Sequence, residues 1–246
     1  MKIKIFQKGF NYSQDGPGNR LVYHLQGCNM RCLWCSNPEG LDMSGEKSSI
    51  YTVEDVVREV IRSKKMFFDG GGVTFTGGEA TCQFDALKVI LIKLKENGIN
   101  TCIETNATHT RLSELVPYVD FIIMDFKHYD DNKHKDNTGI SNKHICENLK
   151  MLAKCAKDYE QNVLVRTPLI HNFNDDKEDV KGFLELYQSF DASYLKFEFL
   201  EYHEYGKDKW NEAHMKYRMV DGFIEAGRKS YFENQLKSIG YNVIHT

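Results

Sequence analysis

The feature that most restricts the fold is one pattern repeated along the chain: a short run of β-branched or aromatic residues, then turn residues, then an amphipathic helix. The predicted strands lie at 20–26, 72–76, 100–105, 120–126, 162–170 and 194–202. The predicted helices lie near 52–68, 84–98, 111–117, 144–157, 175–190 and 223–239. About six strand-then-helix units without linkers imply a parallel sheet with helical crossovers, either a barrel or an open doubly wound sheet.

Local signals agree with the first two helices. One face of the helix near 52–68 carries aliphatic residues at helical spacing, namely Val53, Val56, Val57, Val60 and Ile61. Thr52 and Asp55 have the spacing of a capping box at its start. Gly98 is placed to end the second helix as a C-cap.

Polar or conformationally special residues follow most of the predicted strands. They are Cys28, Gly77 to Glu79, Glu104 to Asn106, Asp125 to Lys127, Arg166 and His203. In a barrel of parallel strands, functional residues come from the carboxyl ends of several strands. The repeated placement therefore predicts a functional site at that end of the barrel.

Length and charge narrow the class of protein. The 246 residues suit a single domain, spanning residues 1–246. The net charge of -3 gives no general attraction to nucleic acid or to an anionic membrane. The start of the chain has no apolar signal-peptide core, and no apolar run approaches the roughly 18 residues of a membrane span. We expect a cytoplasmic monomer that binds neither nucleic acid nor membranes.

Three of the seven cysteines, Cys28, Cys32 and Cys35, lie in one short stretch. An odd number of cysteines in a chain of this size favours a metal or redox site over a disulfide framework. Three thiolates leave a structural zinc site incomplete unless Cys82 or His24 supplies a fourth ligand. A cubane iron-sulfur cluster can instead use three thiolates and leave one iron open to a substrate. The remaining cysteines are expected to be small core residues: Cys82, Cys102, Cys146 and Cys155.

The spacing CxxxCxxC at these cysteines resembles the signature of radical S-adenosylmethionine (SAM) enzymes. Five further segments, in order along nearly the whole chain, resemble the pyruvate formate-lyase activating enzyme and its relatives, which activate glycyl radical enzymes. The segments are DGPGNR (15–20), GGGVTFTGGEA (70–80), DFIIMDFKHYDDNKHKDNTGISN (120–142), VRTPLIHNFNDD (165–176) and EYHEYGKDKW (201–210). The resemblance implies an α/β fold, a partial (β/α)6 barrel of the TIM type with parallel strands inside and helices outside.

The resemblance also implies the chemistry. In this family three thiolates, here those of Cys28, Cys32 and Cys35, hold a [4Fe-4S] cluster, and SAM chelates the remaining iron. Reductive cleavage of SAM gives a 5′-deoxyadenosyl radical, which abstracts a hydrogen atom from a glycine of a partner glycyl radical enzyme. Pyruvate formate-lyase or a relative is the implied partner, and flavodoxin or ferredoxin is the implied electron donor. No further cysteine lies between Ser36 and Thr81, which implies a single-cluster form.

Several residues are assigned to the cofactor site by the same resemblance. They are Trp34, Cys35, Ser36, Gly77, Gly78, Glu79, Asp125, Phe126, Lys127, Arg166 and His203. Residues 34–36 lie on the adenine side, residues 77–79 match the GGE motif at the methionine amino group, and residues 125–127 match a D-x-K motif near the ribose or carboxylate. His203 matches the histidine of a YH motif. Arg166 either binds a carboxylate as a bidentate fork or forms a salt bridge between strands.

Two segments leave alternatives open. Family members that act on pyruvate formate-lyase carry a monovalent cation near an Asp-Thr-Asn segment, and its candidates here are Glu104, Thr105 and Asp125. The longer side chain of Glu104 departs from that pattern. The polar stretch 128–144 is predicted to be a loop that is either solvated or in contact with the partner or closing over the site.

Two other classes of function compete with this interpretation. A radical SAM enzyme that acts on a small molecule, such as 7-carboxy-7-deazaguanine synthase, shares the chain length and the cysteine spacing. A non-catalytic zinc or iron-sulfur binding module would also explain the cysteines, but it would leave the GGE motif and the polar strand ends unexplained.

Overall fold

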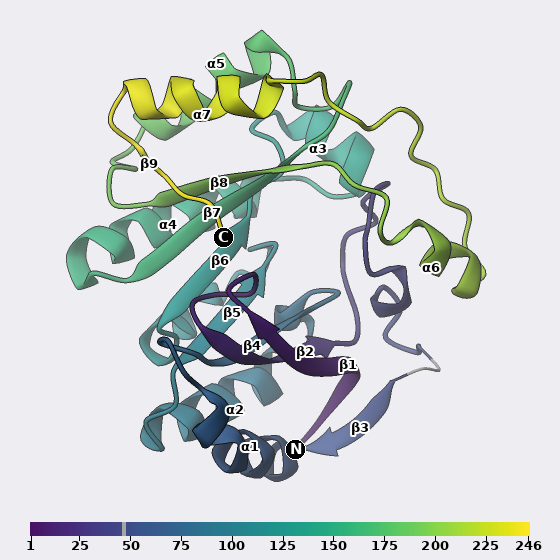
Figure 1. The fold of residues 1–246 in the computed structure, drawn as a ribbon, viewed down its shortest axis with the longest axis vertical. Coiled ribbons are helices and arrows are strands. Elements are labelled where there is room, and N and C mark those ends of the chain that lie inside the picture. Colours follow the sequence, from purple (N-terminus) through teal and green to yellow (C-terminus); the bar gives the residue numbers. More distant parts are fainter. Residues whose placement is uncertain (46–47) are drawn as a thin grey trace.

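A single curved sheet organises the protein in the computed structural model, which describes residues 1–45 and 48–246 (Figure 1). Within these residues its strands lie in the order β3-β1-β2-β4-β5-β6-β7-β8-β9. The strands are β1 (Lys2–Tyr12), β2 (Asn19–Leu25), β3 (Ser49–Thr52), β4 (Gly72–Gly77), β5 (Thr101–Thr105), β6 (Phe121–Asp125), β7 (Asn162–Leu169), β8 (Lys196–Glu201) and β9 (Asn242–Val243). The α-helices are α1 (Val53–Arg62), α2 (Phe84–Glu96), α3 (Asp131–Thr138), α4 (Lys143–Tyr159), α5 (Lys177–Gln188), α6 (Lys207–Glu212) and α7 (Arg228–Ser238).

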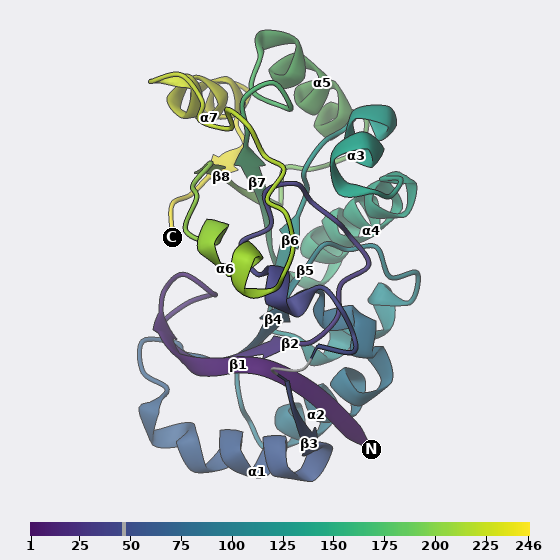
Figure 2. The same ribbon diagram turned by 90° about the vertical axis from the view of Figure 1, so that its right-hand side faces the viewer.

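The six predicted strands form the centre of this sheet. From β2 through β4, β5, β6, β7 and β8, every neighbouring pair is parallel. β3 and β9 stand at the two ends of the strand order, so the sheet is an open arc and not a closed barrel. Figures 1 and 2 show helices such as α1, α2, α4 and α5 along the outer side of the arc. The predicted α/β fold, a partial barrel with outer helices, is therefore confirmed.

Three of the strands in the described part of the chain, β1, β3 and β9, were not predicted. β1 pairs antiparallel with both β2 and β3, and it extends the parallel sheet at one edge. At the start of β1, Ile3 and Ile5 are buried while Lys2 is exposed, as expected for a half-buried strand. At the other edge the short β9 adds to β8 in parallel.

The helix predicted near 111–117 is absent as an α-helix. Two short 3-10 helices, Leu112–Glu114 and Val116–Tyr118, take its place. Pro117 lies in the second of them, and a proline removes one backbone N–H and crowds the preceding turn. The stretch is therefore too interrupted for a regular α-helix.

The polar stretch 128–144 is not the loop that was predicted, because it contains α3. The Asp130 side chain caps the start of this helix by accepting from the backbone N–H of Lys133. Gly139 ends it with φ of 86°, in the left-handed region that glycine adopts most readily. The helix escaped prediction because most of its residues are polar, so hydrophobic periodicity gives no signal.

The predicted signals in α1 and α2 are largely confirmed. Thr52 and Asp55 form the capping box at the start of α1. Four of the five aliphatic residues assigned to its inner face are buried, but Ile61 is 37% exposed, because it lies at the edge of that face. Gly98 follows the last residues of α2 with φ of 62°. No helix in the described part of the chain is long and apolar enough to cross a membrane.

Candidate active site

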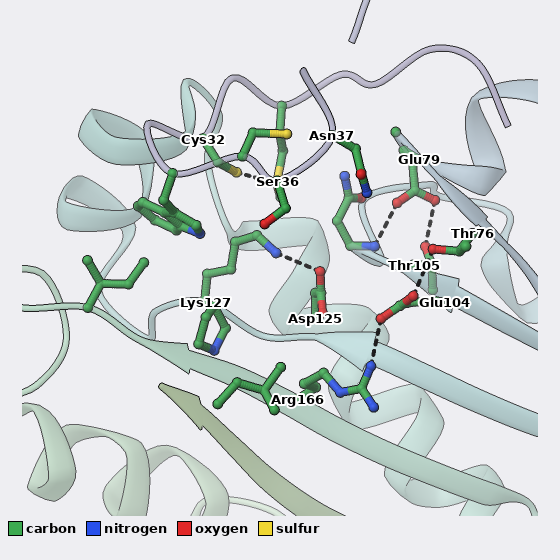
Figure 3. Close-up of a pocket in the computed structure, with 18 of the residues that line it drawn as sticks. Cys32, Ser36, Asn37, Thr76, Glu79, Glu104, Thr105, Asp125, Lys127 and Arg166 are labelled. Atoms are coloured by element: carbon green, nitrogen blue, oxygen red, sulfur yellow. Dashed lines mark hydrogen bonds and ion pairs between the residues drawn. The ribbon is translucent and has the colours of Figure 1, made fainter. Parts of the chain in front are cut away.

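A cavity of about 250 Å³ opens at the carboxyl ends of the parallel strands (Figure 3). It lies between the segment 28–37, here called the cysteine loop, and the ends of β4, β5, β6, β7 and β8. Most of the predicted site residues line it: Cys32, Trp34, Cys35, Ser36, Gly77, Gly78, Glu79, Glu104, Thr105, Asp125, Lys127, Arg166 and His203. Asn106, predicted as a polar strand end, also lines the cavity. No role was predicted for the other lining residues, which are Met30, Asn37, Thr76, Pro168, Ile170, Leu200, Glu201 and Tyr202. Their only sequence signal is a position in or next to a strand end or the cysteine motif.

Two predicted site residues, Cys28 and Phe126, do not line the cavity. Cys28 lies at the start of the cysteine loop, and Phe126 points away from the cavity. Its ring is fully buried and packs against Phe183 and Tyr187 of α5. Side chains alternate between the two faces of a strand, so Asp125 and Lys127 face the cavity while Phe126 faces the helices. The prediction that the side chain of Phe126 belongs to the cofactor site is therefore wrong.

Backbone contacts attach the cysteine loop to the end of β4. The N–H of Glu79 donates to the carbonyl of Gly27 at 2.8 Å, and the N–H of Gly27 donates to the carbonyl of Gly40 at 2.8 Å. A Cβ on Gly78 would lie 2.4 Å from the oxygen of Gly40 and 2.5 Å from that of Gly27. Gly78 therefore permits a close backbone approach, and here the approaching backbone is that of the segment flanking the cysteine loop.

The three thiols of the cysteine loop are buried or half-buried and free of disulfides. Burial raises the pKa of the thiols of Cys28 and Cys32 to about 12 and that of Cys35 to about 11. Metal binding requires thiolates, so these groups must release protons when they bind a metal. Lys127 lies near Cys32 and opposes the shift, because its positive charge favours a thiolate.

The donor set suits a cluster better than a single ion. Within residues 1–45 and 48–246, no three side chains of His, Cys, Asp or Glu converge closely enough to hold one metal ion. Tetrahedral zinc with bonds of about 2.3 Å would need its sulfur ligands within about 4 Å of one another. A cubane attaches each thiolate to a different iron and does not need that convergence. The zinc alternative stays an untested prediction.

The remaining cysteines differ in environment. Cys102 is fully buried, which confirms the core prediction for this residue. Cys146 and Cys155 are partly buried and pack against the core. Cys82 is exposed, so the prediction was wrong for it. It follows the GGE motif in a short 3-10 helix, where its side chain lies outside the core.

Glu79 ties the end of β4 to the end of β5. It is 2% exposed, and its carboxylate accepts from Thr105 Oγ1 at 2.7 Å and from the Asn106 N–H at 2.6 Å. Thr81 donates through both its N–H, at 2.9 Å, and its hydroxyl, at 2.5 Å. Burial raises the pKa of Glu79, and these hydrogen bonds oppose the rise. The Glu79 carboxylate was predicted to accept hydrogen bonds from the methionine amino group. Donors within the protein already use most of its acceptor sites.

Asp125 and Lys127 form an ion pair inside the cavity, with Nζ 2.7 Å from Oδ2 (Figure 3). Lys127 is 7% exposed, and burial alone would lower its pKa. The negative charge of Asp125, and that of Cys32 when it is a thiolate, outweigh that effect and raise the pKa of Lys127 overall. The cavity therefore keeps a positive charge next to the thiols.

Arg166 lies within β7 and joins three strands. Its Nη1 donates to Glu104 of β5 at 2.8 Å, and its Nε donates to Glu198 of β8 at 2.8 Å. Of the two interpretations left open by the sequence, the structure shows the salt bridge between strands. A role toward a cofactor carboxylate stays a prediction.

The candidates for a monovalent cation site are already engaged with protein donors. Glu104 accepts from Arg166 and from Thr76 Oγ1, the latter at 2.7 Å. Thr105 donates its hydroxyl to the buried carboxylate described above, and Asp125 is paired with Lys127. Burial raises the pKa of Glu104, with Arg166 opposing. A guanidinium thus stands next to the acid that would have to bind the ion, so these residues fit a cation poorly.

His203 lies at the edge of the cavity beyond β8. Its ring stacks on Tyr205, with centroids 4.3 Å apart, and Tyr205 is itself 87% exposed. Burial lowers the pKa of His203, which favours the neutral form of the ring. A neutral ring next to an exposed aromatic side chain suits stacking or hydrogen bonding with a planar heterocycle.

Comparison with known proteins places this site in a family. Residues 22–184 match the radical SAM superfamily. The pyruvate formate-lyase-activating enzyme of Staphylococcus aureus (strain USA300) is 38% identical over 216 residues, which cover 84% of each chain.

Solved structures agree on the fold. A domain of pyruvate-formate lyase-activating enzyme from Bacteroides vulgatus ATCC 8482 superimposes with a TM-score of 0.57 at 22% identity, over 71% of this chain and 98% of that chain. Streptococcus suis SuiB superimposes with a TM-score of 0.65 at 16% identity, over 90% of this chain and 47% of that chain. With the cavity, the cysteine loop and the sequence identity in agreement, the chain belongs to the radical SAM superfamily, within the family of pyruvate formate-lyase-activating enzymes.

Proposed function

We propose that this enzyme activates a partner glycyl radical enzyme, pyruvate formate-lyase or a relative, by abstracting a hydrogen atom from one of its glycines. The proposed cofactors are a [4Fe-4S] cluster on Cys28, Cys32 and Cys35 and SAM in the adjoining cavity. When bound, they supply a 5′-deoxyadenosyl radical through reductive cleavage of SAM. The observation that carries the proposal is the joining of the cysteine loop and the GGE strand end in one cavity.

The side chains of the cavity fit the two ends of SAM. The ammonium of Lys127 supplies a positive charge for the methionine carboxylate, and Asp125 next to it offers acceptor oxygens. On the adenine side, Trp34 and His203 offer aromatic surfaces. The protein thus contributes position and charge, while the cofactors contribute the bond cleavage.

The open sheet fits a macromolecular substrate. The two edge strands, β3 and β9, do not pair with each other in the strand order. The proposed role of this gap between the sheet edges is to admit a glycine-bearing loop from the side. Abstraction of a glycine Cα hydrogen needs no catalytic acid or base, because the radical formed between amide nitrogen and carbonyl is itself stabilised. Flavodoxin or ferredoxin is proposed as the electron donor.

The test is activation of candidate partners followed by electron paramagnetic resonance. The reduced enzyme with SAM alone should turn over slowly and leave no stable organic radical. The correct partner should yield a persistent doublet with about one 5′-deoxyadenosine per radical, and deuteration of the partner's glycine Cα should remove the main splitting. Many turnovers with no radical on any partner would instead indicate a small-molecule enzyme and overturn the proposal.

A further inference from the structure

Helix α6 packs directly against the second half of the cysteine loop (Figure 2). Gly206, immediately before the helix, approaches so closely that a Cβ there would lie 2.5 Å from both the Cα and the backbone oxygen of Ser36. Lys209 donates to Asn37 Oδ1 at 3.0 Å and lies 3.0 Å from Glu39 Oε1. The helix therefore contacts the residues that follow the third cysteine through backbone, hydrogen bond and ion pair.

Trp210 extends this contact to the third cysteine itself. Its Nε1–H donates to the carbonyl of Cys35 at 2.9 Å, and the residue is 7% exposed. The indole is held in turn by Tyr217, whose ring meets it edge to face at 5.6 Å. A buried indole N–H with a single backbone acceptor fixes the direction in which that acceptor points.

The first half of the loop is held from a different side. The backbone N–H groups of Arg31 and Leu33 donate to the carbonyls of Thr138 and Asn137 at the end of α3, at 2.7 Å and 3.2 Å. The loop has no regular secondary structure of its own, so its backbone groups depend on such partners. α3 thus holds residues 31–33, and α6 holds residues 35–39.

We infer that α6 positions the third cluster ligand, with Trp210 as the positioning residue that fixes the backbone of Cys35. The identity of the cluster rests on the proposed function, whereas the loop contacts do not. α6 lies beyond residues 22–184, the part of the chain that matches the superfamily. A helix outside that part therefore completes the cysteine loop.

Two consequences follow from the lost hydrogen bond when Trp210 is replaced. One net hydrogen bond corresponds to about a fivefold change in a local opening equilibrium. A looser loop also admits water to the cluster, and solvent exposure and nearby hydrogen bonds set the reduction potential of iron-sulfur clusters. Water favours the more negatively charged reduced state, so the potential should rise.

The experiment compares Trp210→Phe, which keeps an aromatic ring and removes the N–H, with the wild type. Gln161→Leu is the matched control, because Gln161 also donates from its side chain to a backbone carbonyl, that of Val119 at 3.0 Å, away from the cavity. In cluster-free, reduced protein, hydrogen exchange at the amides of Cys35 and Gly40 should quicken about fivefold in Trp210→Phe only. The amides of Arg31 and Leu33 should not change.

The reconstituted protein supplies the second readout. Trp210→Phe should lose iron to a chelator several-fold faster than the wild type, show altered g-values in the reduced state and have a higher reduction potential. Gly206→Ala, which forces α6 away from Ser36, should shift the same measurements. It is the replacement variant if Trp210→Phe does not fold.

The outcomes separate the two claims. Unchanged exchange, iron loss and potential in a folded Trp210→Phe would overturn the positioning role while leaving the proposed function intact. Faster exchange at residues 35–40, in a protein whose wild type binds no cluster, would support the contact and overturn the proposed function. Equal changes in Gln161→Leu would overturn the inference, because the effect would then be general destabilisation.

Discussion

Replacing Arg166 by methionine should destabilise the fold by about 3–5 kcal/mol, the usual cost of removing one partner from a buried ion pair. Methionine keeps most of the apolar stem, so the change isolates the guanidinium. That group serves Glu104, Glu198 and two further oxygens, the backbone oxygen of Gln14 at 3.0 Å and Thr246 Oγ1 at 3.2 Å. Arg166 and Glu198 are 6% and 2% exposed, so water has little access to this buried side of the ion pair.

The loss is divided unequally between the two carboxylates. Glu198 keeps hydrogen bonds from the N–H and hydroxyl of Thr246, at 2.7 Å and 2.8 Å. Glu104 keeps only Thr76 among the described contacts of its carboxylate, so it carries the larger penalty. Adding Glu104→Gln to Arg166→Met should therefore restore stability by about 1–2 kcal/mol, within the range of coupling energies between contacting residues.

The assay is urea unfolding of the cluster-free protein under reducing conditions, with the linear extrapolation of the unfolding free energy. For a chain of this size the predicted loss corresponds to a melting temperature lower by roughly 6–20 °C. Burial already raises the pKa of Glu104, and removal of the guanidinium should raise it further. A carboxyl with a raised pKa in the folded state is penalised above its unfolded pKa and relieved when protonated. The difference in unfolding free energy between Arg166→Met and the wild type should therefore become smaller as the pH falls from 7 toward 5.

Arg111→Met is the control, because Arg111 forms exposed ion pairs with Glu114 and Asp85 and should cost at most about 1 kcal/mol. An Arg166→Met protein as stable as this control, but with severely weakened SAM binding, would refute the reasoning. The guanidinium would then belong to the cofactor carboxylate, the other interpretation that the sequence left open.

Three further predictions concern the cofactors, and one concerns pH. Alanine at any one of the three cysteines of the loop should remove most iron and all SAM cleavage, whereas Cys146→Ala should keep both in iron and 5′-deoxyadenosine assays. Reconstituted wild type should contain about four irons and four sulfides per chain, and reproducible values near eight would reveal a second ligand set. Exchanging K⁺ for tetramethylammonium at constant ionic strength should leave SAM affinity unchanged in equilibrium dialysis, because Arg166 already occupies Glu104; a dependence on K⁺ would reinstate the cation site. The hydrogen bond to Asp175 raises the pKa of His171, so NMR titration should place it above about 6.5, and Asp175→Asn should lower it. The pair favours folding below the unfolded pKa and loses that effect as the pH rises through the folded one; a wild-type midpoint at or below 6.5 would contradict this.

Residues 128–144 were predicted to contact the partner, and the structure changes which lysine in this stretch best tests that prediction. Lys133 donates to the buried carboxylate of Asp179 at 2.8 Å, so its reversal to glutamate would destabilise the fold as well as alter the surface. Lys135 is exposed on the same helix and is the better single site for charge reversal. Its reversal should weaken activation of a partner more than uncoupled SAM cleavage, because charge on a docking surface acts on association.

What the sequence by itself determined is local. Residues close together in the chain specify the strand and helix alternation, the Thr52–Asp55 capping box and the grouping of three cysteines, because period, cap and motif each need only a few neighbouring positions. The placement of polar residues at strand ends also predicted most of the cavity, because parallel strands bring their carboxyl ends to one side.

Only the tertiary structure decided which of these polar groups are available for a ligand. Glu79 was predicted to meet a methionine amino group, and Arg166 either to bind a carboxylate or to pair between strands. The folded chain engages both with residues far along it. Trp210 and Cys35 are 175 residues apart, and no local pattern links an indole in a short helix to the carbonyl of a cysteine. Such pairings depend on strand order and loop path, which are set by burial of the whole sheet and not by the residues that finally touch.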